Sequence, residues 1–144
     1  AGVPASLNAL NKAYRVQEKA ANAGFDWEEA EEVWAKVQEE IGEFSVEAEK
    51  VRLIRHNLDI PAEEVEKATA RMESEMGDVF FSLVNASRLY GVIPENALEK
   101  CNKKFIRRFN YIEEKAHEAG RPLKELSLEE MEELWQQAKA TDPR

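Results

Sequence analysis

The chain has 144 residues, the length of one compact domain, and 43% of them are hydrophobic, so a buried core is expected. Its formal net charge of −9 argues against DNA or another polyanion as the main partner, whereas a small anionic substrate is compatible because a bound metal ion can reverse the local field. A single cysteine excludes an internal disulfide framework, and no signal peptide or membrane-spanning apolar run is found, so we expect a cytoplasmic protein without a membrane partner.

Hydrophobic periodicity predicts three helices and no strand in the first two thirds of the chain. The first helix covers about residues 6–23, and the second begins after Asp26, a suitable N-cap. The third helix runs from Pro61, a residue typical of a first helical position, to Tyr90. The predicted buried stripe of the second helix consists of Trp27, Ala30, Trp34, Val37, Ile41, Phe44, Ala48 and Val51. That of the third helix consists of Val65, Ala68, Met72, Met76, Val79, Leu83 and Ala86.

Two further helices are predicted in the rest of the chain. The fourth helix starts near Pro94 and ends before Gly120, with Cys101 on its apolar face as a small buried side chain. Residues Ser127 and Glu130 form a capping box at the start of the fifth helix. The fold class is therefore predicted as an all-α helical bundle, with residues 1–144 as a single domain.

Two acidic clusters lie in the middle of the second and third helices. They are Glu39-Glu40-x-x-Glu43 and Glu75-x-x-Asp78, and a spacing of three residues places two carboxylates on one face of a helix. If the two helices pack together, these carboxylates repel one another unless a cation lies between them. Ligand sets made only of oxygen suit hard ions, above all Mg²⁺ when a phosphate is present. With 29 Asp and Glu in the chain, a solvated acidic surface explains the same pattern.

The position of the acids relative to the apolar stripe favours a buried role. Glu40, Glu43, Glu75 and Asp78 each precede a stripe residue, as Glu40 precedes Ile41, so both clusters are expected at the border of the buried face. Glycines interrupt both clusters at Gly42 and Gly77, where a glycine costs about 1 kcal/mol relative to alanine. Close approach of a second helix or of a ligand would explain these glycines.

Basic and aromatic residues in the last two helices are candidates for nucleotide contacts. Lys104 and Arg108 share a helix face, with Asn102 near the same edge, and such residues are common phosphate ligands. Surface salt bridges to the many acids are the alternative. Trp135 and Lys139 also share a face, where an indole could stack on a base and an ammonium could reach a phosphate. A core tryptophan beside a solvated lysine is the alternative for that pair.

Five segments, in this order, resemble the MazG family of nucleoside triphosphate pyrophosphohydrolases, in particular its catalytic C-terminal domain. The segments are residues 24–27, 39–43, 75–81, 102–109 and 128–135. The departure from the family pattern is a long spacer of 31 residues between Glu43 and Glu75. Full MazG proteins carry two such domains, so the chain resembles the second half of one. Because it starts at Ala1, we expect a processed terminus or a piece of a longer protein.

The resemblance implies an all-α NTP pyrophosphatase fold, a homodimer, and hydrolysis of an NTP to an NMP and pyrophosphate with Mg²⁺, for which Mn²⁺ can substitute. The residues that match the family's metal ligands are Glu40, Glu43, Glu75 and Asp78. The residues that fall where the family contacts nucleotide are Lys36, Glu39, Arg71, Lys104, Arg108, Trp135 and Lys139, to which the matching segment adds Asn102. Glu39 is the candidate for orienting or deprotonating water, and Lys104 and Arg108 are expected to offset charge in the transition state.

Two kinds of alternative function remain. Another enzyme of the same superfamily, namely a dUTPase- or dCTPase-like hydrolase or a phosphoribosyl-ATP pyrophosphatase, would use the same carboxylates. A non-catalytic helical interaction module would not need them, so the intact acidic clusters argue against that reading.

Overall fold

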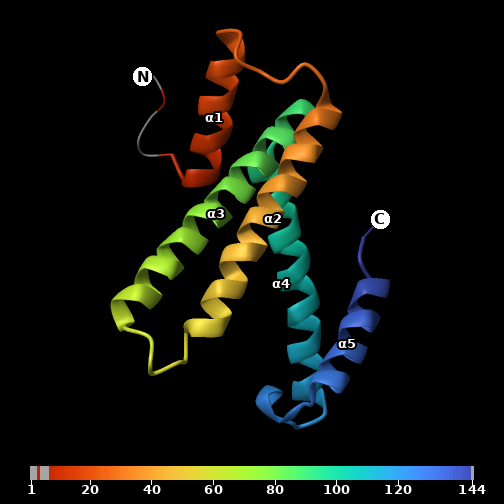
Figure 1. The fold of residues 1–144 in the computed structure, drawn as a ribbon. Helices are drawn as coiled ribbons and strands as arrows, with labels where there is room; N and C mark the ends of the chain where they lie inside the picture. The colour runs from red at the N-terminus through yellow and green to blue at the C-terminus, as the bar shows by residue number, and fades with distance from the viewer. Residues whose placement is uncertain (1–2, 4–6, 144) are drawn as a thin grey trace. The chain divides into compact units, whose positions relative to one another are not determined.

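The computed structural model describes residue 3 and residues 7–143, and all the regular structure within these residues is helical (Figure 1). This confirms the predicted all-α fold. The described residues form two compact units that divide between Glu95 and Asn96. The elements are α1 (Ala9–Asn22), α2 (Ala30–Ile54), α3 (Ala62–Leu89), α4 (Pro94–Glu118), the short 3₁₀ helix η1 (Leu123–Glu125) and α5 (Leu128–Ala140). None of the described helices has both the length and the apolar character needed to cross a membrane.

The first unit is built on a long hairpin of α2 and α3, which lie side by side along most of their length (Figure 1). Helix α1 packs against α3. The core near the start of α2 consists of Val33, Val37 and Ala86, with Trp27 and Leu89 packed against it. The long spacer between the two acidic clusters is accommodated by this hairpin, because both helices continue beyond the clusters to the connecting turn.

The buried face of α2 agrees only in part with the predicted stripe, in which Val37 and Val51 are buried as predicted. Val33, Val37 and Glu40 are buried, whereas the predicted stripe residues Trp34 and Ile41 are 44% and 46% exposed. The inward positions follow alternating steps of four and three residues, which is the spacing of a coiled-coil seam. Apolar side chains occupy two adjacent stripes of α2, so periodicity alone could not show which stripe faces α3. The correction moves Glu40 from the border of the buried face into the buried face itself.

The beginning of α2 also differs from the prediction. Asp26 is not its N-cap, because the helix starts at Ala30 with Glu29 in the cap position and without a side-chain cap hydrogen bond. Instead, the Asp26 carboxylate accepts a hydrogen bond from the backbone N–H of Trp27 at 2.8 Å and pairs with Arg88 of α3. Asp26 therefore ties the α1–α2 connection to α3.

Two other helix starts differ in detail from the prediction. Helix α1 begins at Ala9, where Asn8 supplies the cap, and Ser6 lies outside the described residues. Pro61 is the N-cap of α3, and the first helical residue is Ala62.

The glycines within the acidic clusters are not explained by close packing. A Cβ atom placed on Gly42 or Gly77 would meet no atom within 4 Å, and both residues are exposed. The expectation that a second helix approaches these glycines was therefore wrong. Both lie on the outward side of the α2–α3 hairpin.

The second unit contains α4 from Asn96 onward, η1 and α5. The predicted capping box is confirmed: Ser127 Oγ accepts from the Glu130 N–H at 3.1 Å, and Glu130 Oε1 accepts from the Ser127 N–H at 3.2 Å. The prediction of a buried Cys101 was wrong, since Cys101 is exposed. Within this unit the aromatic contact from α4 to α5 is made by Phe105, one turn beyond Cys101.

Candidate functional site

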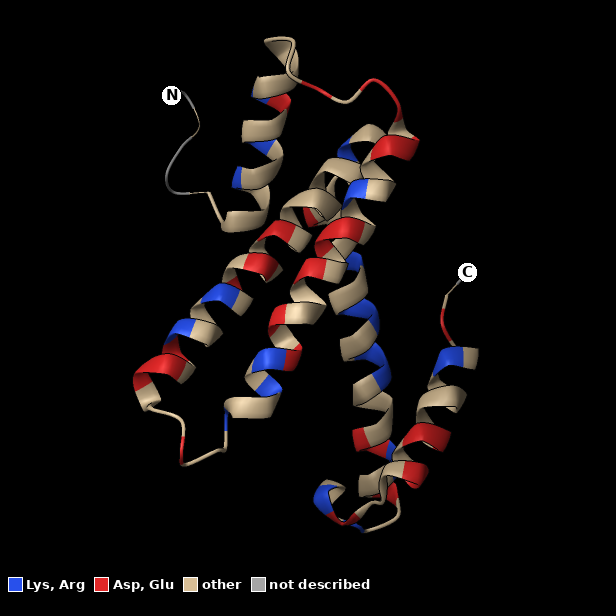
Figure 2. Cartoon of the chain, in the orientation of Figure 1, with Lys and Arg blue, Asp and Glu red and all other residues tan. Residues whose placement is uncertain are grey.

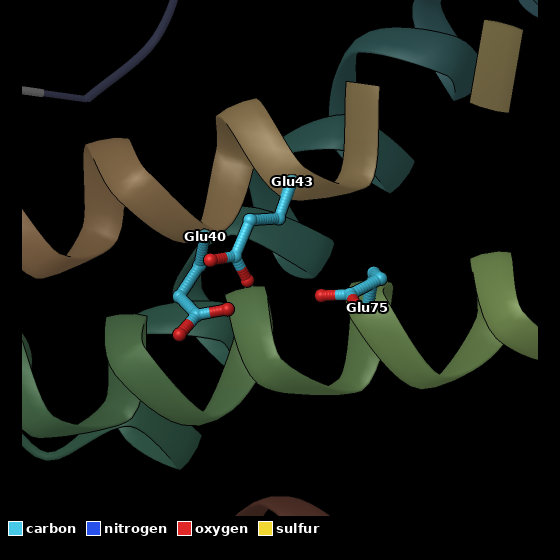
Figure 3. Close-up of side chains that lie close together, drawn as sticks. All are labelled: Glu40, Glu43 and Glu75. Carbon is cyan, nitrogen blue, oxygen red and sulfur yellow. The ribbon is translucent and has the colours of Figure 1, made fainter. Parts of the chain in front are cut away.

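Three of the four predicted metal ligands converge between α2 and α3. Glu40 and Glu43 extend from α2, Glu75 extends from α3, and Figure 3 shows their carboxylates directed into the space between the two helices. One carboxylate oxygen from each residue lies within 4.8 Å of those of the other two. The hairpin therefore brings together acids that lie more than thirty positions apart in the sequence.

Burial makes this cluster unlike a solvated acidic surface. Glu40 is only 7% exposed and Glu75 is half-buried, whereas Glu43 is exposed. In the described part of the chain, Oε2 of Glu40 and Oε2 of Glu75 are buried and accept no hydrogen bond. A carboxylate oxygen removed from water without a donor is costly, and such atoms are rare in folded proteins. A divalent cation would satisfy both oxygens, so these residues fit a hard metal ion.

The mutual repulsion of these acids affects the pKa of Glu43. The neighbouring charge of Glu40, followed by loss of hydration and the charge of Glu75, raises the pKa of the Glu43 carboxyl above its usual value. Among the described residues, Glu43 and Glu75 form no salt bridge with a lysine or an arginine. Of the three carboxylates, Glu43 and Glu75 therefore carry charge that no described basic side chain pairs with.

Two basic residues flank the cluster. Lys36 Nζ lies 3.0 Å from Glu40 Oε1 and 3.6 Å from Glu39 Oε2, and its hydrogen bond with Glu40 is the main cause that raises the pKa of Lys36. On the other side, Arg71 Nε lies 3.7 Å from Glu47 Oε2. Lys36 and Arg71 were predicted to contact nucleotide. The structure places each of them beside an acid of α2, at opposite ends of the cluster.

The fourth predicted ligand, Asp78, lies at the edge of a neighbouring cavity. It is not part of the three-carboxylate cluster, but it lines a cavity of about 460 Å³ together with Glu40 and Lys36. This cavity lies entirely within the first unit and is formed by α1, the α1–α2 connection, α2 and α3. Its volume is typical of small-molecule sites.

The cavity also contains polar side chains that sequence reasoning missed. Gln17 is 5% exposed, and its Nε2 donates to the backbone carbonyl of Phe81 at 3.0 Å. Oε1 of Gln17 is buried and accepts no hydrogen bond from the described residues. A signal existed, since Gln17 follows Leu10 and Tyr14 at steps of four and three and thus occupies a position of the inward face of α1.

In the second unit, two predicted nucleotide contacts lie together. The Arg108 guanidinium lies over the Trp135 ring, 5.2 Å from its centroid, and Phe105 packs against the same ring at 5.3 Å. Arg108 Nε donates to Asp142 Oδ2 at 2.9 Å, and Arg107 also pairs with that carboxylate. The other predicted contacts of this unit are exposed: Asn102, Lys104 and Lys139.

The charge distribution differs between elements (Figure 2). Acidic segments occur along both α2 and α3, and lysine and arginine segments follow one another along α4. The first unit therefore holds clustered carboxylates that suit a cation, while the second unit carries basic side chains on α4 and acidic ones on α5.

Comparison with known proteins identifies the family of this chain. The family model described as "MazG nucleotide pyrophosphohydrolase domain" matches residues 17–112. The chain is 39% identical over 134 residues to the "Nucleoside triphosphate pyrophosphohydrolase/pyrophosphatase MazG" of Thermotoga maritima, covering 93% of this chain and 45% of that protein. It is also 39% identical over 137 residues to the "Nucleoside triphosphate pyrophosphohydrolase" of Escherichia coli K12, covering 95% of this chain and 47% of that protein. The chain thus spans less than half the length of these two relatives. The match over two thirds of its residues shows that the chain belongs to the MazG nucleotide pyrophosphohydrolase domain family.

Proposed function

We propose that this chain hydrolyses nucleoside triphosphates to a nucleoside monophosphate and pyrophosphate, with Mg²⁺ held by Glu40, Glu43 and Glu75, and with Asp78 as the fourth ligand. The observation that carries the proposal is the three-carboxylate cluster with two buried, unpartnered oxygens. The activity named for the relatives in Thermotoga maritima and Escherichia coli supports the choice of substrate.

The metal would supply positive charge opposite the phosphates and make nearby water more acidic. Glu39 is the proposed residue that orients the attacking water or takes its proton. Its side chain is 57% exposed and lies near Lys36, so it is accessible to water and outside the three-carboxylate cluster. Lys36 Nζ lies 3.0 Å from Glu40 Oε1, and Lys36 is proposed to pair with a phosphate oxygen instead when the nucleotide binds.

The roles of the second unit follow from the family resemblance. Lys104 and Arg108 are proposed to offset charge on the phosphates during the reaction, as phosphoryl transfer requires. The proposed nucleotide-binding residues are Lys36, Arg71, Asn102, Trp135 and Lys139. We further propose that residues 1–144 act as one catalytic domain and that the protein is a homodimer.

The direct test is a substrate panel with product identification. The chain is incubated with each of the common NTPs and dNTPs, dUTP included, and with phosphoribosyl-ATP, in the presence of Mg²⁺. Chromatography then separates nucleoside monophosphates, nucleoside diphosphates and pyrophosphate. We expect a nucleoside monophosphate and pyrophosphate in equal amounts, and no reaction in EDTA. Release of a diphosphate and orthophosphate would contradict the proposal.

The same panel separates the alternatives. A strong preference for dUTP, dCTP or phosphoribosyl-ATP would assign the chain to another specificity within the superfamily. A helical module without catalytic function would release no pyrophosphate from any of these compounds, and its buried carboxylates would then need another explanation.

A further inference from the structure

The cavity of the first unit extends well beyond the carboxylates. At one end it is lined by Glu40, Asp78 and Lys36. The rest of its wall combines apolar side chains with a small group of polar ones. The apolar lining consists of Val16, Ala20, Phe25, Trp27, Val33 and Phe81. A mainly apolar wall with a few fixed polar groups is typical of sites that bind a small organic molecule.

The orientation of the Gln17 amide is fixed by its neighbour. Because a backbone carbonyl can only accept, the amide nitrogen of Gln17 must face the carbonyl of Phe81, to which it donates. Oε1 of Gln17 is thereby left as an acceptor that the described residues do not use, on a side chain that is 5% exposed and lines the cavity. A buried acceptor of this kind indicates a ligand that carries an N–H or O–H donor.

The adjacent residues of α3 supply further fixed groups. Ser82 Oγ donates to the carbonyl of Val79 at 2.8 Å, so its lone pairs remain available to the cavity. Arg88 Nη2 donates to Asn85 Oδ1 at 3.1 Å, which orients the Asn85 amide and leaves its nitrogen as a donor. Arg88 itself is held by the Asp26 carboxylate. The cavity thus presents both acceptors and a donor in a fixed arrangement.

We propose that the base of the nucleotide binds in this cavity of the first unit and that Gln17 reads its edge by accepting a base N–H. This inference rests on the proposed NTP hydrolysis. Nucleobases fit the cavity chemistry because each has apolar faces and an edge that carries both donors and acceptors. The end of the cavity at Glu40 and Asp78 leads to the carboxylate cluster, where the phosphates and the metal ion belong.

The test measures binding of the reaction product, so that it does not depend on turnover. Nucleoside monophosphates are titrated into the protein in Mg²⁺ buffer by calorimetry, and ribose 5-phosphate serves as the probe that lacks a base. Gln17→Met keeps the length of the side chain and removes its acceptor. We expect about 10-fold weaker binding of at least one monophosphate, as for loss of a buried hydrogen bond, and unchanged binding of ribose 5-phosphate. The rise in melting temperature with Mg²⁺ should be retained, because the carboxylate cluster is intact.

A matched pair of serine variants covers the case in which Gln17→Met does not fold. Ser82 and Ser87 both donate to a carbonyl of α3, but only Ser82 lines the cavity. Ser82→Ala should weaken monophosphate binding, and Ser87→Ala should not. Equal affinity of the wild type for monophosphates and ribose 5-phosphate would overturn the inference. So would unchanged monophosphate binding in both Gln17→Met and Ser82→Ala. Failure of the wild type to release pyrophosphate would instead refute the proposed function, whereas the binding titrations test the base site alone.

Discussion

The carboxylate of Asp142 lies against the guanidinium of Arg108, with Nε of Arg108 donating to Oδ2 at 2.9 Å and Nη2 contacting the same oxygen. Both side chains are largely buried, at 11% and 18% exposed. The hydrogen bond from Arg108 is the main cause that holds the pKa of Asp142 below its usual value, so this carboxylate is ionised at neutral pH. An acid near the end of the chain therefore pairs with the arginine proposed to bind phosphate.

We expect Asp142→Asn to strengthen substrate binding. Removing the charge frees Arg108 for a phosphate, because a carboxylate and a phosphate compete for the same guanidinium fork. The KM for NTP should fall about threefold to tenfold, which corresponds to about 0.7–1.4 kcal/mol, the net contribution of one hydrogen bond. Steady-state kinetics measure this change, with Glu132→Gln, an exposed acid of α5, as the control. A higher KM would show that Asp142 positions Arg108 for the substrate and does not compete with it.

The carboxylate cluster predicts a loss of metal binding in two single variants. Glu40→Gln and Glu75→Gln each remove a charged oxygen ligand while keeping the side-chain shape, so activity should fall about 100-fold or more. Wild-type protein should melt at a higher temperature with Mg²⁺, as expected for a ligand of the folded state, and both variants should lose this increase. In EDTA they should melt no lower than wild type, since repulsion among the acids is relieved.

Thermal melting with and without Mg²⁺ measures both effects. Glu66→Gln is the control, because Glu66 is an exposed acid of α3 outside the cluster. Near-full activity and a retained Mg²⁺ response in both cluster variants would mean that these acids are only a surface feature.

The raised pKa of Glu43 predicts a pH dependence with a defined sign. The folded state binds the Glu43 proton more tightly than the unfolded state, so the slope of unfolding free energy against pH is negative in this window. Without metal, the ionised Glu43 carboxyl destabilises the folded state. This destabilisation is absent at a pH below the usual glutamate pKa and develops as pH rises through the raised pKa of Glu43. Glu43→Gln should melt increasingly above wild type over that range, as measured by calorimetry in EDTA. A difference that shrinks with rising pH would contradict this assignment.

Bound Mg²⁺ should counteract this loss of stability at higher pH, because the metal ion and the proton compete for the same carboxylates. The increase in wild-type melting temperature with Mg²⁺ should be larger at about pH 7 than at about pH 5. The comparison needs only the wild-type protein and two buffers. A response that is independent of pH would indicate that Glu43 is not among the groups that bind the ion.

Trp135→Ala tests whether the indole binds the nucleotide. Base stacking is worth about 1–3 kcal/mol, so the KM should rise about 10-fold for purines and pyrimidines alike, with a smaller change in kcat. Phe105 and Arg108 contact the same ring, so the melting temperature must be measured on the same sample. Trp135→Phe retains an aromatic ring and should raise the KM less. A large thermal loss with unchanged KM would make Trp135 a packing residue only.

The exposed apolar side chains of the first unit predict a homodimer. Phe80 and Phe81 are 59% and 45% exposed on α3, and Trp34 is 44% exposed on α2. Apolar surface of this kind commonly marks an interface. Sedimentation at micromolar concentration should give twice the mass of the chain, and Phe80→Lys should shift the protein toward the monomer. Leu58→Lys, at a fully exposed turn position, should leave the mass unchanged. A wild-type monomer that hydrolyses NTP would refute dimerisation alone.

The helices, the family and the acidic clusters could all be predicted from the sequence. These depend on local patterns: the capping box at Ser127, the apolar periodicity, and the spacing of the acids in α2 and α3. The order of the five family segments indicated the family. The spacing of the carboxylates indicated a hard cation, since such ions prefer oxygen ligands. Such signals lie within a few helical turns, so they can be read without knowledge of how the helices pack.

Which side of each helix is buried depends on how the helices pack. Glu40 was expected at the border of the apolar stripe of α2 and is buried, whereas the stripe residues Trp34 and Ile41 are exposed and Val37 and Val51 are buried. Cys101 was placed in the core by the same reasoning and is exposed. Gln17 lies on the inward face of α1, but its hydrogen bond to Phe81, 64 positions away, could not be predicted from that pattern. Burial and hydrogen bonding between distant segments depend on the packing of whole helices, which a local pattern does not encode.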